Sequence, residues 1–268
     1  MFRNLFIITA LLILIGAPSS HSQESTDQAT DSKKQESKST PTKKSAAPKL
    51  SLEQVLENYY KAIGGLQNWR DVNTMRMGGV MVSMGQPVPI RAIYMRPNKC
   101  KVEYKVKDAV IVQAYDGKMA WQHNPHGEVV LPQPMSTGKS NYLHDTCDID
   151  GPLIDYKKKG NKIELLGTET LYGNDTYKLK ISYKTGNVQT YFLDSKTFLP
   201  VRLDGVYQLD GLEHKVTTSY FDYKKAGKLV IPYKLDFDIT GSPGTEEVIF
   251  KTVQINPRLN ESSFKKPD

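Results

Sequence analysis

Hydrophobic residues repeat with two different periods along this chain, and the period changes near residue 74. Before that point, apolar residues fall at the three-to-four spacing of one helical face. Ser51 and Gln54 have the form of a capping box, and Gly64-Gly65 supplies the positive φ that commonly ends a helix. The pattern therefore predicts one N-terminal helix, whose apolar face carries Leu52, Val55, Leu56, Tyr59 and Ile63.

From Thr74 onward, apolar and polar residues alternate, as in β-strands that bury one face. Turn signals such as Asp116-Gly117 and Gly186-Asn187 separate these segments. No strand–helix–strand alternation appears, which argues against a parallel nucleotide-binding sheet. The pattern predicts an antiparallel meander of about 11 to 12 strands, drawn from segments 74–84, 88–94, 99–106, 109–115, 118–123, 128–131, 162–166, 177–183, 188–193, 200–203, 213–223, 235–239 and 246–255.

Residues 136–159 interrupt the meander with a less regular stretch that fits one or two short helices. A single sheet of this length must curl to bury one of its faces. We therefore predict a mainly antiparallel β fold, a strongly curved and incomplete β-barrel. The N-terminal helix and the helical insertion are expected to cover its concave face.

The beginning of the chain has the features of an export signal. Arg3 precedes an apolar run over residues 5–15, a helix-breaking Gly16-Ala17-Pro18 follows, and a cut after Ser22 fits the small-residue rule. The run is much shorter than the roughly 20 residues of a spanning helix, so an uncleaved anchor is the weaker alternative. We expect residues 1–22 to be a cleaved signal peptide and the mature protein, without a transmembrane span, to be periplasmic.

Residues 23–48 are almost entirely polar, with no aromatic or branched aliphatic side chain. Such a segment cannot bury enough surface to offset the entropy of ordering it. It is predicted to be a disordered polar linker, with a tether that lifts the domain off a membrane or wall as the alternative. The folding unit is then a single domain over residues 49–268.

Charge and motifs exclude several classes of function. The net charge of +7 is modest, and the basic residues form short runs such as Lys157-Lys158-Lys159, so no nucleic-acid partner is expected. His123 and His126 flank a proline, so they cannot lie on one face of a helix, and no third metal ligand is evident nearby. Nucleophile elbows, zinc-protease motifs and phosphate-binding loops are absent. The sequence therefore predicts no enzyme, no metal and no cofactor.

The sequence contains two cysteines, Cys100 and Cys147, which either form a disulfide or remain free thiols. An exported chain meets an oxidising environment, so a disulfide between them is a candidate. Such a bond would pin the insertion to the sheet and, on the chain-entropy account, would stabilise the fold by about 4 kcal/mol. Two unpaired thiols are the alternative, and the sequence does not decide between them.

Methionines are concentrated between residues 75 and 135. Flexible thioether side chains suit a surface that accepts irregular apolar cargo, although ordinary core packing explains them equally well. Three of these methionines, two aromatic residues and one residue of the insertion form the candidate ligand-binding set: Met75, Met77, Met81, Tyr115, Trp121 and Leu153.

A series of short motifs resembles the outer-membrane lipoprotein-sorting proteins of the LolA/LolB-like superfamily. The series covers most of residues 49–268, and no single motif is specific alone. Its members, in chain order, are Ala62-Ile63-Gly64-Gly65, Arg96-Pro97-Asn98-Lys99, Ala114-Tyr115-Asp116-Gly117, Trp121, Asp150-Gly151-Pro152-Leu153-Ile154-Asp155-Tyr156, Tyr191-Phe192-Leu193-Asp194, Leu199-Pro200-Val201-Arg202 and Ile255-Asn256-Pro257.

This resemblance implies a curved antiparallel barrel in which helices cover a hydrophobic cavity, as in carriers of acylated lipoproteins. This chain differs from a compact carrier because it has a long polar linker. In addition, the arginine that locks the lid of the carrier cannot be matched to a position in this sequence. The expected function is a non-enzymatic cell-envelope binding protein that holds a lipid or the acyl chain of a lipoprotein, with transport in lipoprotein sorting as its specific form. The alternative is an envelope protein-interaction or sensor module that uses the same fold as a scaffold.

Overall fold

A computed structural model describes residues 49–127, 130–242 and 244–267. The predicted signal peptide and linker lie outside these ranges. The helices are α1 (Leu52–Ala62), α2 (Leu66–Arg70), α3 (Thr137–Thr146) and the 3-10 helix η1 (Glu261–Phe264). The strands are β1 (Thr74–Ser83), β2 (Gln86–Met95), β3 (Lys99–Val106), β4 (Ala109–Tyr115), β5 (Ala120–His123), β6 (Gln133–Pro134), β7 (Lys162–Leu171), β8 (Asn174–Ser182), β9 (Val188–Asp194), β10 (Pro200–Leu209), β11 (Leu212–Ala226), β12 (Leu229–Ile239) and β13 (Glu246–Ile255).

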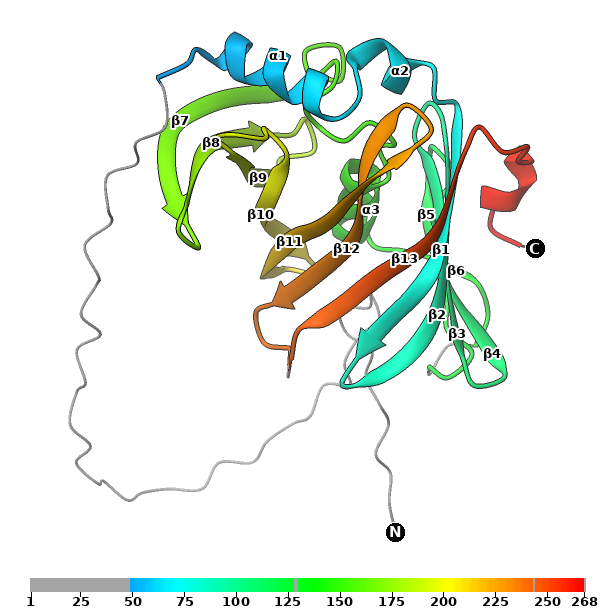
Figure 1. Cartoon of the computed structure of the whole chain (residues 1–268). Coiled ribbons are helices and arrows are strands. Elements are labelled where there is room, and N and C mark those ends of the chain that lie inside the picture. The colour runs from blue at the N-terminus through cyan, green and yellow to red at the C-terminus, as the bar shows by residue number, and fades with distance from the viewer. Residues whose placement is uncertain (1–48, 128–129, 243, 268) are drawn as a thin grey trace, which may run out of the picture.

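All of these strands belong to one antiparallel sheet. Its 13 strands follow the order β6-β5-β4-β3-β2-β1-β13-β12-β11-β10-β9-β8-β7, so β6 and β7 are its two edges and the sheet is not closed. The sheet curls strongly, with α1 and α2 across one end and α3 within the curl (Figure 1). The predicted fold, a curved and incomplete antiparallel barrel, is confirmed.

The sheet consists of two meanders, β1–β6 and β7–β13, joined where the first strand pairs with the last. In this seam Met75 lies opposite Ile255, and the register shifts between Gly78 and Gly79. The backbones approach so closely there that a Cβ at Gly79 would lie 2.0 Å from the carbonyl oxygen of Ile249. Glycine at position 79 is therefore required by the seam itself.

The strand order explains why the insertion crosses the concave side. Strands β6 and β7 are consecutive in sequence but lie at opposite edges of the sheet, so residues 135–161 must lead from one edge to the other. Within this segment, α3 packs against β4, β5 and β10, which belong to different meanders. A single helix reaches both halves because the sheet curls around it (Figure 1).

Helix α1 covers the concave face at the β8–β10 side of the sheet. The predicted capping box is present: the Gln54 amide donates to Ser51 Oγ, and the Ser51 amide donates to Gln54 Oε1. Val55, Leu56 and Tyr59 are buried, so the predicted apolar face is the one that packs. The helix ends where the Val230 amide donates to the carbonyl of Ile63, at the turn between β11 and β12.

The structure differs from the sequence prediction in the stretch after β5. A strand was expected over residues 128–131, of which 128 and 129 lie outside the described residues. Val130 and Leu131 are not in a strand, and the short edge strand β6 follows them instead. The reason is that the apolar residues that suggested a strand, Val130 and Leu131, are 56 and 71% exposed and do not pack in the core.

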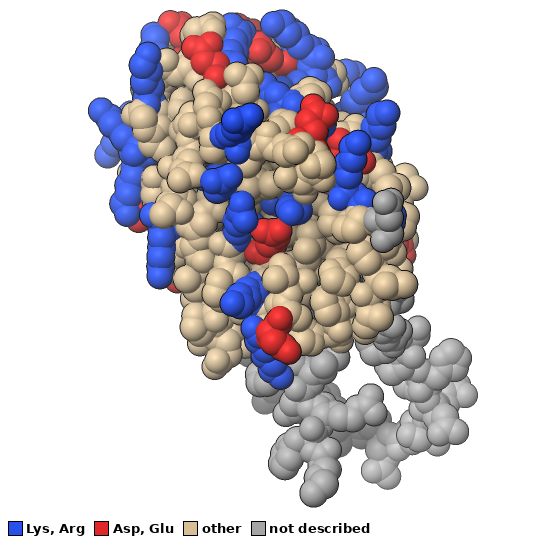
Figure 2. Space-filling model, turned by 90° about the vertical axis from the view of Figure 1, so that its right-hand side faces the viewer, with Lys and Arg blue, Asp and Glu red and all other residues tan. Residues whose placement is uncertain are grey.

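Figure 2 shows the side of the molecule on which β1–β5 and η1 lie. Lys and Arg side chains are distributed over this face and are interrupted by Asp, Glu and uncharged residues. Within the described part of the chain, no helix is long and apolar enough to span a bilayer.

The close approach at the seam predicts different effects for two adjacent substitutions. Gly79→Ala places a methyl group against the backbone of β13, which cannot retreat without breaking the pairing, so we expect it to lower the free energy of unfolding by about 2–3 kcal/mol. In Gly78→Ala the nearest atom, at 2.9 Å, is Oγ1 of exposed Thr252, which can rotate away, so we expect a loss below about 1 kcal/mol. Urea unfolding with the disulfide intact measures both, and equal losses would contradict the assigned packing.

Candidate functional site

The concave interior of the sheet is the largest continuous apolar region of the described chain. Three buried clusters form it, one along β1–β3, one under α1 and one around α3. Partly buried aromatic residues connect them: Trp69 packs on the first two clusters, and Tyr94 and Phe237 pack on the first and the third. The interior is therefore one connected apolar surface.

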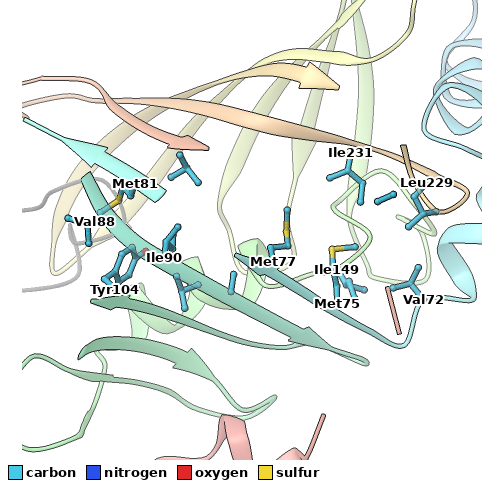
Figure 3. Close-up of a cluster of buried hydrophobic side chains, with 14 of the residues drawn as sticks. Val72, Met75, Met77, Met81, Val88, Ile90, Tyr104, Ile149, Leu229 and Ile231 are labelled. Atoms are coloured by element: carbon cyan, nitrogen blue, oxygen red, sulfur yellow. The ribbon is translucent and has the colours of Figure 1, made fainter. Parts of the chain in front are cut away.

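Five of the six predicted ligand-binding residues face this interior. Met75, Met77 and Met81 line β1 in the first cluster, where Figure 3 shows Met77 midway between the Met75 and Met81 ends. Leu153 lies in the cluster under α1, and Tyr115 lies in the cluster around α3. All five are buried by neighbouring side chains, so they are spread along the interior rather than gathered at one point.

Trp121 lies on the opposite face of the sheet, apart from the other five residues. It packs with Val112 and Ala114, and its indole Nε1 donates to the carbonyl of Phe264 at 2.7 Å. The C-terminal segment that carries Phe264 runs outside the sheet (Figure 1). Trp121 therefore anchors the C-terminal segment to the convex face. Its alternation with Ala120, which faces the interior, was the sequence signal for this placement.

Residues 135–161, called the cover below, are attached covalently at one point. Cys147, the residue that ends α3, forms a disulfide with Cys100 of β3, with 5.2 Å between the Cα atoms. Both residues are buried in the cluster around α3. The bond fastens the middle of the cover to the concave face of the first meander.

A buried ion pair holds the cover a few residues further on. Arg96, in the turn after β2, donates from Nη1 to Asp150 Oδ2 at 2.6 Å and from Nη2 to Asp150 Oδ1. The same guanidinium donates from Nη2 to the carbonyl of Trp69 at 2.8 Å and from Nε to the carbonyl of Val72. The Asp150 side chain is only 3% exposed. Arg96 therefore connects the cover to α2 and to the segment that leads from α2 to β1.

More exposed links lie around this pair. Arg70 of α2 binds Asp155 with two hydrogen bonds, of 2.6 and 3.0 Å, and this lowers the pKa of the Asp155 carboxyl. Lys159 Nζ lies 2.6 Å from Asp148 Oδ2. Burial nevertheless raises the pKa of Asp148, because removing this carboxylate from water outweighs the attraction of Lys159. Tyr60 of α1 donates to the carbonyl of Leu153 at 2.9 Å.

The α3 end of the cover is tied to the second meander. Asp145 is buried and accepts hydrogen bonds from Thr185 Oγ1 and from Asn187 Nδ2, both in the turn between β8 and β9. His144 Nδ1 lies 2.9 Å from Asp145 Oδ1, and this hydrogen bond raises the pKa of His144. Lys139 forms an ion pair of 2.6 Å with Asp210. Polar contacts thus attach the cover on both sides of the interior.

Tyrosine and glutamine side chains add a polar component to the concave face. Tyr183 donates to Gln189 Oε1 at 2.6 Å, and Gln189 Nε2 donates to the Tyr207 hydroxyl at 2.8 Å. The ring of Tyr142 from α3 meets that of Tyr207 edge to face. Burial raises the pKa of Tyr142 to about 12, so its phenol stays neutral at physiological pH.

A surface hollow of about 460 Å³ lies on the outer side of the cover. It runs between α1, α2 and the residues after Ile154, with charged side chains around an apolar floor. Its lining comprises Glu53, Leu56, Glu57, Tyr60, Leu66, Arg70, Asp155, Tyr156, Lys157 and Lys158.

Of the two neighbouring histidines, His123 is the last residue of β5 and His126 lies in the turn that follows it. Nε2 of His123 lies 3.0 Å from the carbonyl oxygen of Val130, and Nε2 of His126 lies 3.3 Å from that of Val106. Among the described residues, no group of three or more His, Cys, Asp or Glu side chains is arranged to hold a metal ion.

No protein-family model and no curated protein matches this sequence. Solved structures do match the fold. A DUF1329 family protein from Desulfovibrio piger aligns with a TM-score of 0.55 and 12% identity, covering 80% of this chain and 97% of that one. A LolA superfamily protein from Nitrosomonas europaea aligns with a TM-score of 0.55 and 12% identity, covering 81% and 99%. The chain has the LolA-superfamily fold.

A third structure with this fold is a domain from Vibrio parahaemolyticus described as an outer membrane lipoprotein-sorting protein. It aligns with a TM-score of 0.53 and 12% identity over 80% of this chain and 95% of the other. The predicted resemblance is therefore confirmed at the level of architecture. Arg96 holds the cover through Asp150, and the sequence alone did not reveal this pair because the two residues are 54 positions apart.

The two arginines that hold the cover should contribute very differently to stability. Arg96→Met removes both hydrogen bonds from the guanidinium to the buried Asp150 carboxylate and leaves Lys159 Nζ, 3.6 Å away, as its remaining cation, so we expect a loss of about 3 kcal/mol in the free energy of unfolding. Arg70→Met removes an exposed pair and should cost about 1 kcal/mol or less. Denaturant unfolding gives both values, and hydrogen exchange over residues 147–155 should rise in the first variant only. Similar losses in the two variants would show that Asp150 is not buried as described.

The His144–Asp145 hydrogen bond should make stability depend on pH. Because the folded-state pKa of His144 is raised, its contribution is present below about pH 6.5, the ordinary value, and is lost as the pH rises through the raised value. The difference in unfolding free energy between the wild type and His144→Gln should therefore be larger at about pH 6 than at about pH 8. A difference that stays constant or grows with pH would contradict the assigned contact.

Proposed function

We propose that this protein is a non-enzymatic periplasmic binding protein that holds a lipid or an acyl chain in the concave interior of its sheet. The observation that carries the proposal is the connected apolar surface enclosed between the curled sheet and a separately attached cover. The concave face of the sheet is covered by residues 135–161, which are not part of the sheet. This segment leads from one sheet edge to the other and is attached by a disulfide and by polar side chains as well as by packing.

The driving force for binding is the removal of hydrocarbon from water, worth about 25 cal/mol per Å² of apolar surface. Buried methionines suit an interior that repacks when a chain enters, because their side chains are flexible and polarisable. In the proposed cycle the cover moves away from the sheet, the acyl chain replaces contacts among Met75, Met77 and Met81, and the cover closes over it.

The specific role proposed is that of a carrier in outer-membrane lipoprotein sorting. The fold shared with the Vibrio parahaemolyticus sorting domain supports this role, and so does the predicted signal peptide. In this role the acyl chains of the lipoprotein occupy the interior while its polypeptide remains outside.

A second candidate function is a module that binds an envelope protein. Large apolar side chains are exposed at three of the turns between strands, at Met84, Leu131 and Leu212, which are 55, 71 and 65% exposed. These turns offer a contact surface that does not involve the interior. A pull-down that survives substitution inside the curl would favour this function.

Binding can be tested with a series of straight-chain alcohols from octanol to tetradecanol that compete with an environment-sensitive fluorescent fatty acid. Each added methylene buries more hydrocarbon, so the affinity should rise by up to about 0.8 kcal/mol, or roughly fourfold, per carbon. A long-chain alcohol carrying a diazirine then locates the site after irradiation. Crosslinks, assigned residue by residue by peptide fragmentation, are expected at Met75 and Met81, whereas exposed Met84 serves as the internal control.

Two results would count against the proposed site. Affinity that does not change with chain length would exclude burial of the hydrocarbon as the driving force. Crosslinks confined to Met84 and the other exposed turns would place the lipid outside the interior and would favour the protein-interaction module.

A further inference from the structure

Among the described residues, three polar side chains on the concave face carry buried atoms without a hydrogen-bond partner. They are the Tyr104 hydroxyl on β3, both amide atoms of Gln113 on β4, and Oε1 of Gln122 on β5. Tyr104 and Gln113 are each 0% exposed. Buried polar groups in folded proteins are nearly always hydrogen-bonded, so a group of unsatisfied ones requires an explanation.

Strand register places the three side chains together. Gln113 lies directly opposite Val102 on β3 and directly opposite Gln122 on β5. Tyr104 is two residues beyond Val102 and therefore projects from the same face. Paired residues of adjacent strands have Cβ atoms about 5 Å apart, and diagonal neighbours are about 7–8 Å apart. The three side chains thus form one polar patch in an apolar wall, and Figure 3 shows Tyr104 beside Val88 and Ile90.

A second buried glutamine shows what a satisfied site looks like in the same sheet. Gln189, 3% exposed on β9, accepts from Tyr183 and donates to Tyr207, so both ends of its amide are used. Gln113 is buried at least as deeply and uses neither end. The contrast indicates that the Gln113 amide is available for a group that is not part of the chain.

The chemistry of the patch defines that group. The Gln113 amide offers one acceptor and a donor side by side, Gln122 Oε1 offers an acceptor, and the Tyr104 hydroxyl offers both. Burial raises the pKa of the Tyr104 phenol, which therefore stays neutral. The three side chains include no cation, so an anionic head group would lose its hydration without an ionic partner, whereas a neutral group that donates and accepts would pair with Gln113.

We propose that Tyr104, Gln113 and Gln122 form a subsite for the neutral, amide-type polar group of a ligand whose hydrocarbon part occupies the apolar interior. The inference rests on the proposed function and adds a ligand class to it. Helix α3 packs against β4 and β5, and its Tyr142 lies near enough to influence Tyr104. The subsite therefore lies beneath the cover, and filling it requires α3 to shift.

The test compares three probes that share one chain, dodecanamide, dodecane and dodecanoate, by displacement of a fluorescent fatty acid. In the wild type, dodecanamide should bind more tightly than dodecanoate. Gln113→Met keeps the volume and removes the amide, so it should weaken dodecanamide by about tenfold or more and leave dodecane unchanged. Tyr104→Phe should weaken dodecanamide in the same direction, and Gln189→Met should leave the ratio between dodecanamide and dodecane unchanged.

The outcomes separate this inference from the proposed function. If none of the probes binds the wild type, the proposed function fails and the subsite fails with it. If the probes bind but Gln113→Met changes dodecanamide and dodecane equally, or changes neither, the interior binds lipid without this subsite and the inference alone is overturned.

Stability without ligand provides a readout that does not depend on binding. Gln113→Met removes an unsatisfied amide, so its urea midpoint should equal or exceed that of the wild type. Gln189→Met leaves Tyr183 and Tyr207 without their partner, so its midpoint should fall. If both midpoints fall equally, buried water or a neighbouring group already satisfies Gln113, and the proposed subsite is overturned.

Discussion

The pairing of β1 with β13 is the constraint on which the rest of the structure depends. It joins two meanders into a continuous sheet, and it leaves β6 and β7 as the edges although they are consecutive in sequence. Residues 135–161 must then lead from one edge to the other, and the curl of the sheet places them across its concave face. The cover is thus a direct consequence of strand order. The seam tolerates only glycine at position 79, because the two backbones nearly touch there.

The attachments of the cover differ in kind from the contacts that hold the sheet. The strands are joined by backbone hydrogen bonds over long registers. The cover is held by buried apolar side chains such as Leu153, one disulfide, the buried Arg96–Asp150 pair and polar contacts from Asp145, Tyr60 and Lys139. Side-chain links can break without disturbing the sheet. The proposed function uses this difference: the cover opens while the sheet stays intact.

Much of the architecture could be predicted from the sequence because it depends on local patterns. The capping box at Ser51, the two-residue alternation and the irregular insertion each report on neighbouring residues, and the structure has the helix, the strands and the crossing segment they predict. Features that depend on long-range pairing could not be predicted. The Arg96–Asp150 pair joins residues 54 positions apart that no spacing rule relates, and the placement of Tyr104 near Gln113 depends on the exact register of β3 and β4. Trp121 was grouped with the interior by its type, although its alternation with Ala120 indicated the convex face.

The central claim, that an acyl chain binds between the cover and the sheet, is tested most directly by hydrogen exchange of the purified protein with and without saturating long-chain alcohol. The account predicts altered protection in residues 137–159 and in the concave strands β1, β3 and β4, while η1 and the convex contact at Trp121 stay unchanged. Protection that changes only at the exposed turns, or nowhere despite saturation, would contradict it.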